Sequence, residues 1–131
     1  MKNILLLFML LTPLLGSAQA HLGSSEDEIR EMHIENDFET GYTESGVKYI
    51  SSFMIYGTFY YYFDAYTELS DFCMQIVDEM PNLNRQVEEY NKKYVIVSDT
   101  EWKAYLAGGS VLNITLSYNE ENEVYVFYYA D

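Results

Sequence analysis

Cysteine is nearly absent from this sequence, and its scarcity sets the first limit on the protein. Cys73 is the only cysteine in 131 residues, so no disulfide can form within the chain. Small extracellular animal domains usually carry several disulfides, so this scarcity favours a bacterial origin. A chain of this size buries roughly two-thirds of its unfolded surface, which allows a stable domain without cross-links.

Basic residues are also scarce. Seven lysines and arginines stand against 21 aspartates and glutamates, which gives a formal net charge of −14. A domain this acidic repels phosphate backbones and anionic lipid surfaces, which argues against nucleic-acid and membrane binding. The same charge is compatible with a basic protein partner, with divalent cations, or simply with solubility outside the cell.

The residue types that usually carry chemistry are few and scattered. His21, His33 and Cys73 make a poor set of zinc ligands. Cys73 lies in an apolar strand pattern, where an inert buried thiol is the usual finding. The acids around Gly41 do not match the spacing of a calcium loop. We therefore predict no catalytic residue, no metal site and no cofactor.

The first twenty residues have the pattern of an export signal. Lys2 provides a positive start, an apolar run follows over Ile4–Leu15, and Ala18-Gln19-Ala20 has the small-x-small pattern that signal peptidase recognises. The apolar run is too short to span a bilayer as a mature helix. We predict a signal peptide over residues 1–20, a single domain over residues 21–131, and a secreted or periplasmic location without membrane insertion.

The starts of two helices are predicted from local sequence signals. Ser25 and Glu28 form a capping box that begins a helix over about residues 25–34. Pro81 suits the first turn of a second helix. Lys92 and Lys93 place positive charge where that helix would end.

Alternating apolar residues predict five strands. The longest of these strands is expected to bend at Gly57. Between the third and fourth strands, a capping box at Ser98 and Glu101 predicts a short third helix. This mixture indicates an α+β fold, a single antiparallel β-sheet with two or three helices packed on one face. The expected strands are Val47–Asp64, Phe72–Val77, Tyr94–Val97, Leu112–Tyr118 and Val124–Tyr129.

Aromatic residues are abundant, with 14 tyrosines, 7 phenylalanines and 1 tryptophan. Alternation along Val47–Asp64 predicts that Phe53, Ile55, Phe59, Tyr61 and Phe63 face the helices. Tyr56, Tyr60 and Tyr62 would then stand on the opposite face of the sheet. Exposed tyrosines serve as contacts for proteins or as stacking platforms for sugars. The alternative is that loops or a second copy of the chain cover them.

Several segments together resemble a known group of proteins. They are Tyr61-Tyr62-Phe63-Asp64, Tyr90-Asn91-Lys92-Lys93-Tyr94-Val95, the Trp102-x-x-Tyr105 pattern and the closing strand pair. Along most of its length after residue 20, the chain resembles uncharacterised small secreted α+β proteins of gut Bacteroides-type bacteria. The resemblance implies an α+β domain outside the cytoplasm and supplies no catalytic motif.

Three classes of function follow from these observations. The leading hypothesis is a secreted, non-enzymatic binding protein, such as an acidic inhibitor or immunity-type protein that neutralises a basic toxin or hydrolase. The alternative is a glycan-binding module that uses the tyrosine-rich sheet face. A small hydrolase is the third class, but with 21 acids some carboxylate pair always falls at glycosidase spacing, so that pattern carries no weight by itself.

Overall fold

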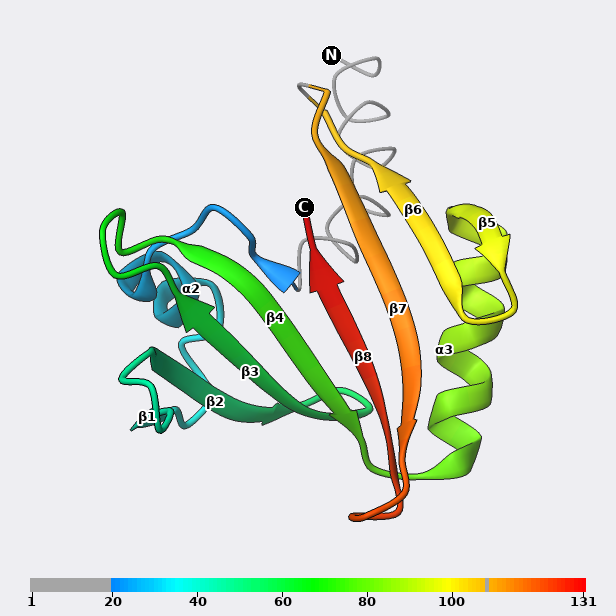
Figure 1. The fold of residues 1–131 in the computed structure, drawn as a ribbon, viewed down its shortest axis with the longest axis horizontal. Helices are drawn as coiled ribbons and strands as arrows, with labels where there is room; N and C mark the ends of the chain where they lie inside the picture. The colour runs from blue at the N-terminus through cyan, green and yellow to red at the C-terminus, as the bar shows by residue number, and fades with distance from the viewer. Residues whose placement is uncertain (1–19, 108) are drawn as a thin grey trace.

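The computed structural model describes residues 20–107 and 109–131, and its strands form one eight-stranded antiparallel sheet (Figure 1). The strand order across the sheet is β1-β2-β3-β4-β8-β7-β6-β5. The elements, in chain order, are α2 (Glu26–Met32), β1 (Glu39–Tyr42), β2 (Lys48–Met54), β3 (Gly57–Phe63), β4 (Ser70–Val77), α3 (Met80–Lys93), β5 (Val95–Ser98), β6 (Glu101–Tyr105), β7 (Val111–Asn119) and β8 (Val124–Ala130).

The sheet consists of two halves with the same order of elements. In each half a helix precedes four strands, α2 before β1 to β4 and α3 before β5 to β8. Within each half, consecutive strands are hydrogen-bonded neighbours, and β4 pairs with β8 to join the halves. Figure 1 shows α2 beside the first half and α3 beside the second. The whole sheet is therefore two antiparallel meanders that meet at their last strands.

Alternation along the strands separates a buried inner face from an outer face. On β3 and β4 the inner positions include Phe59, Tyr61 and Cys73, which have at most 1% of their surface exposed. Burying such side chains contributes about 1.5–3 kcal/mol each. Helix residues Ile29 and Leu83 belong to the same core cluster, which places both helices on the inner face.

A buried polar network fastens α3 to the sheet. The amides of Gln75 on β4 and Gln86 on α3 bond to each other in both directions, at 2.6 and 2.9 Å. The Tyr129 hydroxyl donates to Oε1 of Gln75 at 2.9 Å and lies 2.6 Å from the hydroxyl of Tyr90. Burial raises the pKa of both phenols, so they remain neutral. Because these groups satisfy one another, their burial is tolerated.

The broad prediction of an α+β fold with an antiparallel sheet is confirmed, although the sheet dominates. The capping box of Ser25 and Glu28 is present, with both of its hydrogen bonds. Pro81 lies in the first turn of α3. The predicted face alternation of β4 and the β7–β8 hairpin are also confirmed.

Two predictions of secondary structure are wrong. Val47–Asp64 is not one bent strand but the hairpin of β2 and β3, with Ile55 and Tyr56 as its two-residue turn. Residues after Ser98 form strand β6 and not a short helix. Pairing of β6 with both β5 and β7 outweighs the local preference for a helix start.

Strand β1 was not predicted. The sequence Glu39-Thr-Gly-Tyr42 is short and largely polar, and it forms a strand because β2 pairs with it.

The predicted signal peptide over residues 1–20 falls almost entirely outside the described residues. In the part of the chain that is described, no helix is long and apolar enough to cross a membrane.

Gly57 is the position where the β2–β3 hairpin admits no side chain. Its φ is +143°, and an added Cβ would collide with the backbone carbonyl of Ile76 on β4. We expect Gly57→Ala to cost about 3 kcal/mol or more. Gly46→Ala is the control, since Gly46 also has a positive φ, +88°, but has open space around it; it should cost only about 1 kcal/mol. Urea unfolding of both variants measures the difference, and equal losses would contradict the close approach of β4.

Candidate functional site

Five aromatic rings form a continuous row across the outer face of the sheet. Tyr49 on β2, Tyr60 and Tyr62 on β3, Phe72 on β4 and Tyr128 on β8 make up this row, which we call the aromatic ladder. The neighbouring ring centroids lie 5.4 to 5.9 Å apart. These separations are within the range of attractive aromatic pairs.

The strand register explains why these rings meet. Tyr49 lies opposite Tyr62, and Tyr62 lies opposite Phe72. Residues directly opposite on one face have their Cβ atoms about 5 Å apart, so large side chains at such positions must touch. The ladder is thus a direct consequence of alternation on four neighbouring strands.

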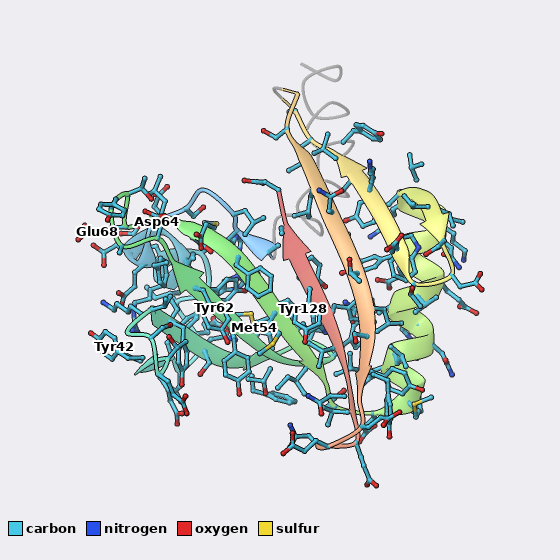
Figure 2. All side chains as sticks on the ribbon, viewed as in Figure 1. Tyr42, Met54, Tyr62, Asp64, Glu68 and Tyr128 are labelled. Carbon is cyan, nitrogen blue, oxygen red and sulfur yellow. The ribbon has the colours of Figure 1, made fainter. Side chains whose placement is uncertain are left out.

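The aromatic ladder is accessible from outside the sheet. All five of its rings are partly exposed, and both helices lie on the opposite face. Phe53, at the end of β2 on the same outer face, is 66% exposed. Figure 2 shows Tyr62 and Tyr128 over the middle of the sheet. An apolar surface of this kind is typical of a contact site.

The ladder is uncharged, and charges lie at its sides. The outer positions of β2, β3 and β8, and those of β4 from Phe72 onward, hold apolar, aromatic and hydroxyl side chains. Asp71, at the start of β4 and directly before Phe72, is exposed and charged. Glu39 on β1 lies opposite Ser51 on this face, and Glu101 and Lys103 on β6 occupy outer positions beyond β7. Burial, together with the neighbouring phenols, raises the pKa of Tyr62. The surface therefore has a neutral aromatic centre and a charged rim.

The structure brings together two of the three predicted binding tyrosines. Tyr60 and Tyr62 both lie in the aromatic ladder, whereas Tyr56 does not. Tyr56 is in the β2–β3 turn with a φ of +68°, and its carbonyl oxygen accepts hydrogen bonds from Gln75 and Asp78. Placing Tyr56 on the same face was wrong because the turn shifts the alternation by one position.

The same shift corrects two core predictions. Phe53 lies on the outer face and Ile55 is 57% exposed in the turn, while Met54 points into the core. Phe59, Tyr61 and Phe63 face the helices as predicted.

Sequence reasoning missed three members of the ladder. Phe72 lies in the predicted strand Phe72–Val77, but nothing in the pattern of that strand identifies which of its two faces is the outer one. Tyr49 and Tyr128 each alternate with buried neighbours. Only the pairing of β2, β3, β4 and β8 shows that the rings meet.

The residues considered for catalysis do not form a reactive site. Cys73 has no exposed surface, and burial raises the pKa of its thiol. Sequence reasoning overlooked a Ser-x-x-Lys spacing at Ser45 and Lys48. Lys48 is the first residue of β2 and pairs with Glu26. Within residues 20–107 and 109–131, no three metal-ligating acids, histidines or cysteines come together.

A groove lies beside the β3–β4 loop, and no ladder residue is among those that line it. It has a volume of about 460 Å³, and Glu26, Lys48, Asp64 and Glu68 are among its lining residues. Figure 2 places Asp64 and Glu68 in this loop. Asp64 accepts hydrogen bonds from the amides of Tyr66 and Thr67, so its carboxylate has a structural role.

The two histidines of the chain form a second cluster, on the inner side of the sheet. Their Nε2 atoms lie 2.7 Å apart, and the ring of His21 lies 5.7 Å from that of Tyr61. Burial, and then the proximity of His33, lower the pKa of His21 from 6.5 to about 4. Burial also lowers the pKa of His33, so the surroundings of both rings disfavour the charged form.

Comparisons with known proteins add no family: no family model matches the chain, and neither the curated proteins nor the solved structures contain a significant match.

The ladder rings should contribute much less to folding than their inner neighbours. We expect Tyr60→Ala to cost about 1 kcal/mol. Tyr61→Ala removes a fully buried ring that stacks on Phe59, and we expect it to cost about 3–5 kcal/mol. Urea denaturation of the two variants gives the comparison. Equal costs would mean that the outer face is part of the folded core.

The histidine pair should make stability depend on pH. Because the pKa of His21 is lower in the folded protein, the unfolded chain binds more protons between pH 6.5 and about 4, and stability falls as the pH drops through this window. We expect a loss on the order of 2 kcal/mol. Thermal unfolding of the wild type and of His21→Gln is measured across this pH range, with a chelator present to remove metal ions. The difference between the two proteins separates the loss due to His21 from the titration of the carboxylates. The same pH dependence in both proteins would contradict the assignment.

Proposed function

We propose that the protein is a non-enzymatic binding protein that docks a macromolecular partner on the aromatic ladder. The observation that carries this proposal is the continuous row of five partly exposed, uncharged rings across one sheet face. Protein interfaces have the same anatomy, with an aromatic centre inside a polar rim. Tyrosine is among the residues that contribute most binding energy there.

The partner proposed is a basic protein outside the cytoplasm. The net charge of −14 attracts cationic proteins over long distances and accelerates their encounter. Glu39 and Glu101 on the rim would meet basic side chains, while the neutral centre would bury apolar ones. An inhibitor or immunity-type protein acting on a basic toxin or hydrolase fits this combination. The predicted signal peptide supports an exported location.

Glycan binding is the second candidate, and one observation favours it. The outer face combines partly exposed tyrosine rings with the hydroxyl groups of Thr58 and Thr115, which are also accessible. Rings that stack on sugars need neither a charged partner nor a deep cleft. Weak dependence on salt would distinguish this mode from docking of a basic protein.

Capture of partners from the exported proteins of the source bacterium tests the proposal. We expect a basic protein to be captured at about 50 mM salt and released at about 300 mM, because screening weakens long-range attraction. Tyr60→Ala and Tyr62→Ala should weaken its binding about tenfold or more. A glycan array examined in parallel covers the second candidate.

Tyr42→Ala and Tyr66→Ala serve as matched controls. Both tyrosines are well exposed, at 65% and 96%, and neither belongs to the ladder. These variants should bind like the wild type. If they lose as much affinity as the ladder variants, or if capture of the partner ignores salt, the proposed surface and its electrostatic steering are wrong.

A further inference from the structure

The two histidines of the chain come from separate segments, and their rings meet edge-on. The sequence contains only His21 and His33. In the structure Nε2 of one ring lies 2.7 Å from Nε2 of the other, and the rings adopt an edge-on arrangement with centroids 4.9 Å apart. Two nitrogen atoms that are good metal ligands therefore converge on one point.

Both rings are held in place by the surrounding backbone. Cleavage after Ala20, as predicted, would make His21 the first residue of the exported protein, so only the chain after it can hold its ring in place. The segment that follows it is tied to β4, because the amide of Gly23 donates to the Ser70 carbonyl and the amide of Ser70 donates to the Ser24 carbonyl. His33 is the C-terminal cap of α2. The convergence of the rings is thus built into the fold.

The chemical state of the rings suits a cation. A metal ion binds the unprotonated nitrogen of an imidazole ring, and the hydrogen bond between the two Nε2 atoms requires one of them to be unprotonated. In the metal-free pair one Nε2 donates a proton to the other. A metal ion would take the place of that shared proton, and the donating ring would carry its proton on Nδ1 instead. No proton is gained or lost in the exchange.

The spacing also suits a cation. Two imidazole nitrogens bound to one ion at about 2.0–2.1 Å lie close to 3 Å apart when they occupy neighbouring coordination positions. To bind one ion, the hydrogen bond between the two Nε2 atoms has to break, and both rings have to turn so that each lone pair points at the ion. His33 is partly exposed, so an ion could reach the rings from solvent.

We propose that His21 and His33 form a two-histidine site for a divalent transition-metal ion, with water completing the coordination. Since no three ligating side chains come together in the described part of the chain, the protein supplies two ligands. Imidazole nitrogen with no thiolate favours Cu²⁺, which binds nitrogen sites more tightly than Zn²⁺ does. The site is independent of the aromatic ladder, which lies on the other face of the sheet.

Titration of the purified chain with Cu²⁺ tests the proposal, followed by electron paramagnetic resonance. We expect one tightly bound ion whose spectrum shows hyperfine coupling to two imidazole nitrogens. Nitrogen coupling separates this site from weak binding by the many surface carboxylates. His33→Asn should weaken binding about tenfold or more and remove one nitrogen. Zn²⁺ should compete only at higher concentration.

Two further variants keep the result interpretable. His21→Gln removes the more buried ligand, and circular dichroism establishes whether this variant folds. His33 is more exposed, so the result with His33→Asn can be interpreted even if His21→Gln does not fold. Met32→Ala, next to His33 and 51% exposed, is the control and should bind like the wild type. A spectrum without nitrogen coupling, or His33→Asn binding Cu²⁺ as tightly as the wild type, would show that the pair is a structural hydrogen bond only.

Discussion

The antiparallel pairing of β4 with β8 is the contact on which the rest of the structure depends. Each half of the chain is a four-stranded meander with one helix, and this single strand pair joins them. Its register also defines both faces of the sheet. Cys73 opposite Tyr129 belongs to the buried side, and Met74 opposite Tyr128 to the outer side. A slip by one residue would exchange core and surface on both strands.

The polar network under α3 makes this arrangement specific. Apolar packing alone would tolerate several positions of a helix on a sheet, whereas the reciprocal amide bonds of Gln75 and Gln86 are satisfied in one position. A displaced helix would leave buried polar groups without partners, at about 1–3 kcal/mol each. Because Gln75 lies on β4 and Tyr129 on β8, the network secures the helix across the junction between the halves.

Local patterns in the sequence correctly predicted the helices and strands that depend on interactions between residues close in the chain. The capping box at Ser25, the proline of α3 and the alternation of β4 act within a few residues, and all three are confirmed. Prediction from local patterns failed where pairing with strands distant in the chain determines the secondary structure. Ser98 and Glu101 have the spacing of a helix start, yet β7 recruits Trp102 and Ala104 as inner residues of a strand. Likewise, no local rule predicts a two-residue turn at Ile55-Tyr56 in place of a bend at Gly57, because the non-glycine residue Tyr56 adopts a positive φ there.

The candidate site was only half predictable for the same reason. Alternation shows which rings share a face, but which face stays open depends on where the helices pack. The hydrogen bonds of the tyrosine hydroxyls agree with the division of the sheet into a buried inner face and an open outer face. On the inner side they have partners within the protein, since Tyr61 donates to the sulfur of Met54 and Tyr90 bonds to Tyr129. Burying a phenol requires such a partner. The ladder tyrosines are partly exposed and can use water instead, so a docking partner can replace that water without disturbing the core.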